Sequence, residues 1–313
     1  MSRLTMQAVQ VHEYGGAERL TLEEVVRPQP QAGEILVRIL FAAAIPLDWK
    51  IRNGWLKNVF PITFPYIPGS SVSGIVESVG EGVIAFQAGD RVFGSVKGAY
   101  AEYGIAAVHE LVSMPDSLSF EDAATIRAGA DTAWKALFTE GELETGQKVL
   151  IHAAAGGVGQ FAVQLAKRKG ATVIATASTG NIEFVKSLGA DIVIDYTTTP
   201  FEDVAKDVDL IVDSVGGDTE ARSWALLKKG GILVSLTQAP SQESAKQYGV
   251  SAKFNTKFPT YENLQEIAQL IADREILAKI DHIYPIREVQ AAHKQSESRH
   301  GQGRILLDLN SKE

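Results

Sequence analysis

The chain has 313 residues, of which 45% are hydrophobic and 22% charged, and it carries a formal net charge of −8. An acidic chain without a dense stripe of lysine or arginine excludes nucleic acid as a partner. No apolar run reaches the roughly 18 residues that span a membrane. The lack of an apolar leader predicts a cytoplasmic protein. The chain contains no cysteine, which excludes disulfides, thiolate nucleophiles and cysteine-ligated zinc, and its six histidines form no i, i+4 pair, so no metal site is predicted.

The first 120 residues have the texture of a β-rich domain. Short runs suited to strands alternate with glycine and proline turns such as Pro68-Gly69. Strands at this short spacing predict a compact, barrel-like β domain. The segments that carry the prediction are Gln7–Val11, Glu34–Ile39, Ser73–Gly82 and Gly89–Gly94.

From about Phe120 onward the pattern changes to alternating helices and strands. The run Glu121–Phe138 is rich in alanine and predicts one helix, and further helices are expected at Val158–Arg168 and Asn181–Leu188. Short apolar strands separated by helices predict a parallel sheet covered on both faces. The strands expected are Lys148–His152, Thr172–Thr176, Ile192–Ile194, Asp209–Asp213 and Gly231–Leu236.

The alternation stops near Phe254. Two amphipathic helices, Tyr261–Asp273 and Pro285–Ser296, precede a closing strand at Ile305–Leu309. A lone terminal strand must pair with another, and pairing with the first β-rich domain would make the domain of alternating helices and strands, here called the dinucleotide domain for the reason given in the next paragraph, an insertion. The expected division is therefore 1–122 for the first part of the β domain, 123–255 for the dinucleotide domain and 256–313 for the return to the β domain.

The turn after the strand at Lys148–His152 is the most informative stretch. In the frame G-x-G-x-x-G its positions fall on Ala154, Gly156 and Gly159, followed by a helix. Such a turn lets the backbone approach a pyrophosphate, and the free N–H groups of the helix then face the phosphates. We expect the contacts to come from Ala155, Gly156, Gly157, Val158 and Gly159.

The end of the next strand bears on the choice of cofactor. Enzymes that use NAD place an acid about 20 residues after the glycines to bind the ribose hydroxyls, but here Ser178 and Thr179 stand there. Hydroxyls in place of an acid favour NADPH. Two observations keep alternatives open: Ser178 can simply cap the following helix, and Gly180-Asn181 supplies no cation for a 2′-phosphate.

Six segments, in order, resemble motifs of the zinc-less quinone oxidoreductase branch of the medium-chain dehydrogenase/reductase superfamily, which includes zeta-crystallin. They extend over nearly the whole chain. They are Pro46–Gly54, Phe64–Val76, Gly89–Val92, Ala153–Gly159, Asp195-Tyr196 and Gly303–Leu307. The resemblance implies an α/β fold in which a Rossmann-type doubly wound parallel sheet is combined with a GroES-like β-barrel domain.

The resemblance also implies NADPH-dependent reduction of a quinone or of an α,β-unsaturated carbonyl. Thr132 is expected near the nicotinamide, and Ser178, Thr179 and Tyr196 near the adenosine phosphate. The remaining cofactor contacts that it implies are Val215, Phe254, Asn255 and Arg304. Relatives commonly form homodimers through edge strands of the Rossmann sheet, and Gly231–Leu236 is the strand expected to serve here.

Three departures from the family pattern stand out. Ile45 and Ser71 occupy positions where many relatives have Asn and Asp, which leaves the substrate open, and Gly180-Asn181 replaces a segment that often supplies a lysine.

Conjugate reduction needs a donor for the charge that develops on the substrate oxygen. Lys50 is the charged candidate for that role, and Asp48 is the residue that would orient it. The structural alternative is that Asp48 caps its helix or pairs with Arg52 at helical spacing. Trp55, Phe60 and Tyr66 would either line the cleft against a flat apolar substrate or belong to the core.

Two other function classes remain open at this point. A non-enzymatic, crystallin-like NADPH-binding protein would bind the cofactor without turnover. Reduction of plain ketones or oxidation of alcohols would need zinc, and the missing cysteines argue against that chemistry.

Overall fold

The computed structural model describes residues 4–311 and divides the chain into two compact units. Each unit has its own sheet and its own apolar core. Unit 1 comprises Met1–Ala128, Tyr261–Glu275 and Ile280–Glu313, and unit 2 comprises Gly129–Thr260 and Ile276–Lys279. Unit 2 is therefore formed by two segments inserted in the sequence of unit 1, one long and one of a few residues.

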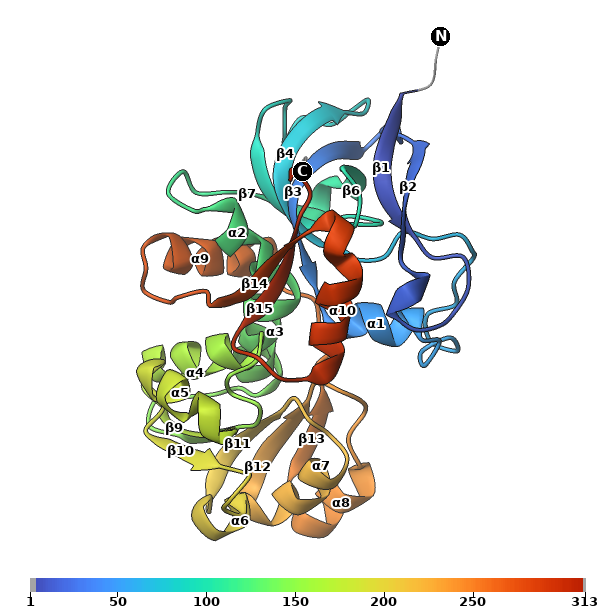
Figure 1. Cartoon of the computed structure of the whole chain (residues 1–313). Coiled ribbons are helices and arrows are strands. Elements are labelled where there is room, and N and C mark those ends of the chain that lie inside the picture. The colour runs from blue at the N-terminus through green and yellow to red at the C-terminus, as the bar shows by residue number, and fades with distance from the viewer. Residues whose placement is uncertain (1–3, 312–313) are drawn as a thin grey trace. The chain divides into compact units, whose positions relative to one another are not determined.

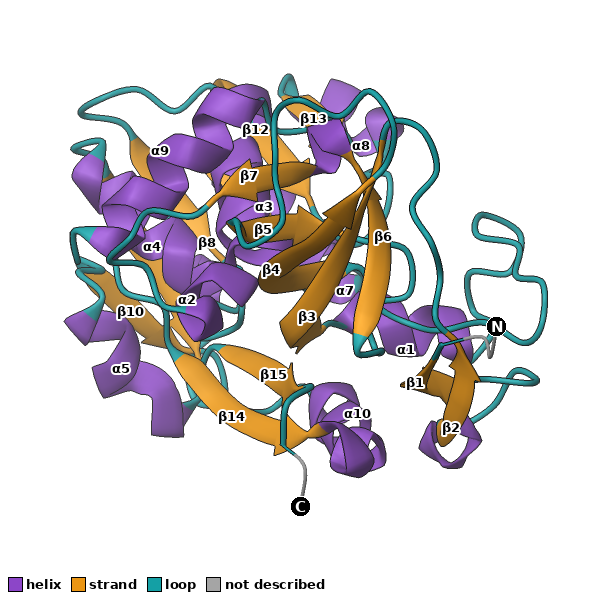
Figure 2. Ribbon diagram, turned by 90° about the horizontal axis from the view of Figure 1, so that it is seen from above, coloured by secondary structure: helices purple, strands orange, loops and turns teal. Residues whose placement is uncertain are grey.

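Unit 1 is built on a seven-stranded sheet, in the order β14-β15-β3-β4-β5-β7 with β6 paired to β3. Figure 2 shows β3, β4, β5 and β6 running alongside one another. A separate antiparallel ribbon joins β1 (Thr5–Gln10) and β2 (Thr21–Val26). The strands of the main sheet are β3 (Glu34–Ala44), β4 (Ser71–Val79), β5 (Arg91–Ser95), β6 (Tyr103–Ala107), β7 (Leu111–Ser113), β14 (Ile280–Pro285) and β15 (Arg304–Asp308).

The closing strand β15 pairs antiparallel with β3 and parallel with β14, so the expected pairing of the last strand with the first β-rich region is confirmed. The helix α10 (Val289–Ser298) packs beside these strands (Figure 1). The helix α1 (Pro46–Arg52) begins at a proline, whose fixed φ angle suits the first helical position. Unit 1 also contains α2 (Phe120–Ala124) and α9 (Tyr261–Ala272).

The single helix expected over Glu121–Phe138 is wrong. The backbone leaves the helical conformation at Arg127, where ψ is 142°, and at Ala128, where φ is +55°. The helix that starts with α2 therefore ends before this point, and a new one, α3 (Asp131–Trp134), begins after it and continues as a wider turn through Glu140. The break coincides with the passage of the chain from unit 1 to unit 2.

Unit 2 is built on a six-stranded sheet in the order β10-β9-β8-β11-β12-β13, and every pair in it is parallel. Consecutive strands run outward from β8 in one direction and from β11 in the other. Because crossovers are right-handed, the helices of the two halves lie on opposite faces. The strands are β8 (Lys148–Ile151), β9 (Thr172–Ala177), β10 (Ile192–Asp195), β11 (Val208–Asp213), β12 (Leu227–Ser235) and β13 (Ser251–Phe254).

The connecting helices of unit 2 are short. They are α4 (Gly159–Arg168), α5 (Ile182–Ser187), α6 (Phe201–Val204), α7 (Asp218–Ser223) and α8 (Gln242–Tyr248). None of the helices within residues 4–311 is long and apolar enough to cross a membrane.

The expectation that Gly231–Leu236 forms an edge strand is wrong. These residues belong to β12, which is hydrogen-bonded to β11 on one side and to β13 on the other. The sequence segment Ser251–Phe254 was too short and too polar to stand out as a strand, so the outer position could not be assigned from the sequence.

Candidate functional site

The carboxyl ends of the six parallel strands of unit 2 gather most of the residues expected to hold a cofactor. β8 and β11 are the neighbours at which the strand order reverses, and nucleotides bind at such switch points. Loops that leave this edge carry Ala155, Gly156, Gly157, Val158 and Gly159 after β8, Ser178 and Thr179 after β9, Tyr196 after β10, Val215 after β11, and Phe254 and Asn255 at the end of β13. Residues from five strands are therefore brought to one edge of one sheet.

The turn after β8 has the form of a phosphate cradle. A Cβ atom at Gly159 would lie 2.6 Å from Ala154 Cα and closer still to the Ala153 carbonyl oxygen, so only glycine lets the helix start this near the strand. The N-terminus of α4 follows at once, and its first turn has neither a side-chain cap nor an acidic residue. An uncapped helix N-terminus behind a glycine turn suits a pyrophosphate.

A buried histidine fixes the start of this turn. His152 is 1% exposed, and its ring contacts Thr176 Oγ1 through Nδ1 (3.2 Å) and Ser223 Oγ through Nε2 (3.0 Å). Because the Ser223 hydroxyl donates to the Thr219 carbonyl, it accepts from Nε2–H, and Nδ1 then accepts from Thr176. Thr176 Oγ1 in turn accepts from the Ala153 N–H, which ties the turn to β9.

Burial lowers the pKa of His152 to about 4, against the opposing attraction of the Asp213 carboxylate. The ring is therefore neutral at physiological pH, as its two-sided hydrogen bonding requires.

The carboxylate of Asp213, at the end of β11, shapes the next loop. It is fully buried and accepts from the backbone N–H groups of Val215 (2.9 Å) and Gly216 (3.0 Å). Gly216 has a φ of +77°, and a Cβ there would crowd Thr237 Oγ1 at 2.5 Å. Val215, an expected cofactor contact, is left 46% exposed at the tip of this turn.

Thr132 and Asn255 are brought together although 123 residues separate them in the sequence. The Asn255 side chain donates from Nδ2 to the Thr132 carbonyl oxygen over 3.1 Å. Its Oδ1 is buried and has no hydrogen-bond partner within residues 4–311. An unpartnered buried acceptor is costly, so its presence at this edge fits a site completed by a donor group of a ligand.

The loops after β9 and β10 form a cluster of hydroxyls around one acid. Thr179 Oγ1 donates to Asp195 Oδ2 over 2.6 Å, and Thr197 Oγ1 donates to Asp195 Oδ1 over the same distance. Ser178 makes no side-chain cap to the following helix, and its hydroxyl instead accepts from Asn181 Nδ2 at 3.2 Å. The capping alternative for Ser178 is therefore wrong.

Asp48 lies in unit 1, on α1, and is 5% exposed. Its Oδ2 accepts from the Ile45 N–H (3.0 Å) and from the Tyr100 hydroxyl (2.7 Å). Burial raises the pKa of Asp48 to about 6, while these two hydrogen bonds act in the opposite direction. The bond to Ile45 satisfies a free N–H at the start of α1, so the capping alternative for Asp48 is confirmed, whereas no ion pair joins it to Lys50 in the described part of the chain.

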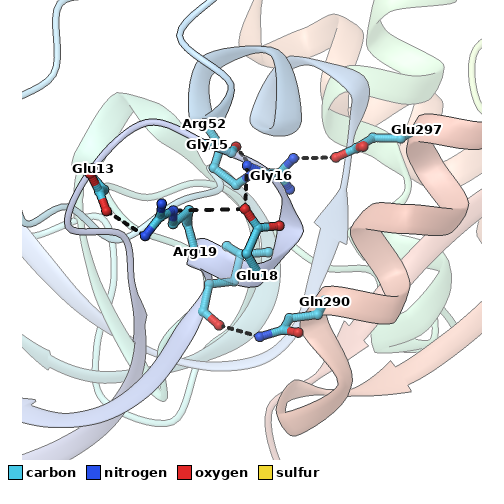
Figure 3. A network of polar contacts seen from close by, with 9 residues as sticks. Glu13, Gly15, Gly16, Glu18, Arg19, Arg52, Gln290 and Glu297 are labelled. Atoms are coloured by element: carbon cyan, nitrogen blue, oxygen red, sulfur yellow. Dashed lines mark hydrogen bonds and ion pairs between the residues drawn. The ribbon is translucent and has the colours of Figure 1, made fainter.

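Arg52, on the same helix, turns away from Asp48. Its guanidinium is fully buried and donates to the Gly15 carbonyl oxygen (3.0 Å), to His293 Nδ1 (2.8 Å) and to the Glu297 carboxylate. Figure 3 shows it reaching from α1 to the Gly15 loop and to α10. The expected pairing of Arg52 with Asp48 is therefore wrong, because partners distant in sequence occupy its donors.

Lys50 is half-buried on α1, with Nζ 5.8 Å from the centre of the Trp49 ring. Burial lowers its pKa, and the neighbouring charge of Arg299 adds to the effect. The Trp55 ring meets Trp49 edge to face at 5.2 Å and is 65% exposed, and Phe60 is 44% exposed. The core alternative for Trp55 and Phe60 is therefore wrong.

Arg304 lies at the start of β15 in unit 1, and its expected contact with the cofactor stays a prediction. It is 4% exposed and donates to the Ala128 carbonyl oxygen. Ser71, which stands where many relatives have Asp, donates to the carbonyls of Ala124 (3.2 Å) and Arg127 (3.0 Å). Both side chains hold the helix break near Ala128.

Sequence reasoning missed His152, Asp195, Asp213 and Tyr100. Each of the first three stands at or directly after the last residue of a parallel strand, so that position was the signal available for them. Tyr100 carried no such signal. Within residues 4–311 no group of three or more His, Asp or Glu side chains could hold a metal ion.

Comparison with known proteins gives a consistent result. Residues 31–116 match the family described as "Alcohol dehydrogenase GroES-like domain", and residues 188–307 match "Zinc-binding dehydrogenase". The chain is 33% identical to the chloroplast envelope quinone oxidoreductase homolog of Arabidopsis thaliana, over 98% of this chain and 100% of that protein. It is 38% identical to the 2-methylene-furan-3-one reductase of Solanum lycopersicum, over 75% of this chain and 63% of the relative.

Solved structures agree in fold. The quinone oxidoreductase from Coxiella burnetii superposes with a TM-score of 0.92 at 34% identity, covering 98% of this chain and 100% of that one. The mycobacterial Rv1454c, solved in complex with NADPH, superposes with a TM-score of 0.87 at 29% identity, covering 97% and 99%. The expected Rossmann-type sheet and GroES-like domain are thereby confirmed. The chain belongs to the medium-chain dehydrogenase/reductase superfamily, in its quinone oxidoreductase or zeta-crystallin-like branch, and is an oxidoreductase that uses a nicotinamide cofactor on a small-molecule substrate.

Proposed function

We propose that this protein is an NADPH-dependent, zinc-independent reductase of quinones or α,β-unsaturated carbonyl compounds. The observation that carries the proposal is the cradle at the carboxyl edge of the unit 2 sheet, where Gly159 and the uncapped α4 follow β8. The hydroxyls of Ser178 and Thr179 stand where an enzyme that uses NAD would carry its acid, which favours NADPH. A related protein was solved with NADPH, and relatives are named quinone oxidoreductases and a furanone reductase.

Zinc independence rests on the donor set. Zinc in proteins is held by Cys, His and carboxylates, usually three or four of them together. This chain has no cysteine, and its described residues contain no group of three possible ligands. The residues present therefore do not fit zinc.

The residues that would hold NADPH do fit it. The backbone from Ala155 to Gly159 would meet the pyrophosphate, and Thr132, Val215, Phe254 and Asn255 would line the path toward the nicotinamide end, with Tyr196 near the adenosine. A bound nicotinamide supplies hydride to an electron-poor carbon. The unpartnered Asn255 Oδ1 would then gain a donor, which fixes the position of the bound group.

The chain's own contribution to the chemistry lies on α1. Hydride addition to an enone or quinone leaves negative charge on an oxygen, and a nearby cation stabilises that charge. Lys50 is the residue proposed for this role, because it is half-buried, its pKa is lowered by burial, and its Nζ lies 5.8 Å from the centre of the Trp49 ring. Asp48 then acts on the position of α1 through its bonds to Ile45 and Tyr100.

The direct test is NADPH oxidation by the purified protein on addition of 9,10-phenanthrenequinone or a short alkenal. Turnover of either class supports the proposal. Lack of turnover across a broad panel of both classes would contradict it. Tight NADPH binding without any turnover would favour the crystallin-like alternative, and turnover that depends on added zinc would overturn the zinc-independent reading.

A further inference from the structure

We propose that Asp195 opposes a 2′-phosphate and thereby limits the preference of the site, so that NADPH is favoured over NADH only weakly. The inference rests on the proposed nicotinamide site and concerns its strictness. Asp195 is the last residue of β10 and lies beside Thr179, which follows β9 and is one of the residues proposed to face the adenosine phosphate.

The geometry fixes the carboxylate at this place. Both oxygens are engaged: Oδ2 accepts from Thr179 Oγ1 (2.6 Å), and Oδ1 accepts from the Thr197 hydroxyl (2.6 Å) and backbone N–H (3.0 Å). The Thr179 hydroxyl can donate one hydrogen bond, and it donates that bond to Asp195. A 2′-phosphate, which needs donors, therefore cannot use Thr179 while Asp195 is ionised.

No cation offsets this charge. The hydrogen bond from Thr179, followed by those from Thr197, lowers the pKa of Asp195, so the carboxylate is ionised at neutral pH. Lys186, the nearest lysine along the sequence, has an acidic partner of its own, Glu183. The carboxylate is thus held by neutral donors alone among the described residues.

The energetic consequence follows from the charges. A 2′-phosphate carries about −1.5 to −2 at neutral pH, whereas a ribose hydroxyl is neutral and can donate to a carboxylate. A fixed negative charge therefore disfavours NADPH and is neutral or favourable toward NADH. Because the cluster lies near solvent, the repulsion is modest and falls as salt is added.

Gly180, next to Thr179, is a second position at which the charge of the same site can be changed. A Cβ atom built there meets no atom within 4 Å, and its φ angle is not in the left-handed region. A longer side chain at this position therefore has open space. Gly180→Arg places a cation next to Thr179 without requiring the backbone to move.

The experiment measures binding rather than turnover. Calorimetric titrations with 2′,5′-ADP and with 5′-AMP give the ratio of the two affinities, which measures the contribution of the 2′-phosphate alone. Titrations with NADPH and NADH give the corresponding ratio for the whole cofactors. The variants are Asp195→Asn, which keeps the shape and one acceptor oxygen but removes the charge and replaces the other oxygen by an NH2 donor, and Gly180→Arg. The matched control is Glu243→Gln on α8, which removes the same charge after β12, four strands away in the sheet, or roughly 19 Å.

In the wild type we expect 2′,5′-ADP and 5′-AMP to bind within about tenfold of each other. Asp195→Asn should raise the ratio in favour of 2′,5′-ADP roughly fivefold to tenfold at low salt, and most of this gain should disappear at 0.5 M KCl. Gly180→Arg should raise it by a similar factor, and Glu243→Gln should leave it unchanged.

A wild-type preference for 2′,5′-ADP of a hundredfold or more would overturn the inference, as would an unchanged ratio in Asp195→Asn. A gain that persists at high salt would also overturn it, because a merely structural effect is not screened. If Asp195→Asn does not fold, the result for Gly180→Arg decides. If Gly180→Arg shows no salt-sensitive gain in the affinity ratio, the inference is contradicted. Failure of both nucleotides and both cofactors to bind the wild type would instead overturn the proposed function itself.

Discussion

Nη1 of Arg52 lies 2.8 Å from Nδ1 of His293, although 241 positions separate them in the sequence. Because arginine only donates, Nδ1 of His293 accepts, and Nε2–H is left to donate to the Tyr100 hydroxyl at 3.1 Å. Tyr100 then donates to Asp48 over 2.7 Å. Hydrogen bonds donated in one direction thus run from Arg52 at the end of α1, through His293 on α10 and Tyr100, back to Asp48 near the start of α1.

Acid should destabilise the fold through His293. Burial, and then the charge of Arg52, lower its pKa to about 3, whereas in the unfolded chain it is near 6.5. The unfolded state therefore binds more protons between these values, so stability is complete above about pH 6.5 and is lost as pH falls toward 3. At pH 5 the loss is about 2 kcal/mol from His293, and His152, with its pKa lowered to about 4, adds a similar amount.

Asp48 works in the opposite direction, since its pKa is raised to about 6 and its stabilising contribution is lost as pH rises from about 4 to 6. Urea unfolding at pH 7.5 and 5.0 measures the balance. His293→Gln, which does not titrate, should show a smaller difference between the two pH values than the wild type. His300→Gln, an exposed control, should show the same difference as the wild type. If His293→Gln also shows the wild-type difference, the pH dependence does not come from His293.

Removal of the Arg52 guanidinium should unfold unit 1 far more readily than removal of an exposed one. Arg52→Gln leaves Glu297 and the Gly15 carbonyl without their buried donor, and breaking one side of such a pair costs about 3–5 kcal/mol. Arg19→Gln is the matched control, because Arg19 pairs with Glu13 in the same region but is 45% exposed (Figure 3). Its loss should cost under about 1 kcal/mol in urea unfolding, and similar losses in the two variants would disprove the buried role.

Alanine substitutions at three glycines should show whether the close backbone approach at the phosphate cradle, rather than a general need for glycine in the turns, determines stability and NADPH binding. Gly159→Ala puts a methyl against Ala153 and Ala154 and should cost about 1–3 kcal/mol and weaken NADPH binding at least tenfold. Gly156→Ala meets only the Ala153 oxygen at 3.3 Å and should have a smaller effect, and Gly180→Ala meets nothing. Thermal unfolding and NADPH fluorescence titration give both quantities; a Gly159→Ala protein that binds NADPH like the wild type would refute the cradle.

Lys50 should affect turnover and leave cofactor binding intact. If its charge stabilises the developing oxyanion, Lys50→Met should lower kcat with an enone or quinone about 10²-fold, the usual loss when one such donor is removed. NADPH affinity should stay within twofold, and Lys50→Arg should recover part of kcat because it keeps the charge. An unchanged kcat in Lys50→Met would assign the charge stabilisation to water or to the backbone.

The sequence by itself determined the order of the elements and the chemistry that each could offer. Apolar runs located β8, β9, β10 and β11 to within one residue at either end, since a buried strand needs apolar side chains wherever it lies. They placed the start of β12 four residues too late and did not reveal β13. The glycine run marked the cradle, and at Gly159 only glycine tolerates the close approach of the backbone. Absence of cysteine removed thiolate chemistry before any geometry was known.

Only the tertiary structure decided which polar groups meet. The Arg52 side chain finds His293 and Glu297 from a helix near the other end of the chain, and the break at Ala128 depends on Ser71 and Arg304, which lie far from it in sequence. Such contacts leave no local periodicity, so the helix through Ala128 was predicted wrongly, and of the two structural alternatives for Asp48 the sequence could not exclude the pairing with Arg52. For the same reason the carboxylate of Asp195 beside Thr179 emerged only when β9 and β10 lay side by side.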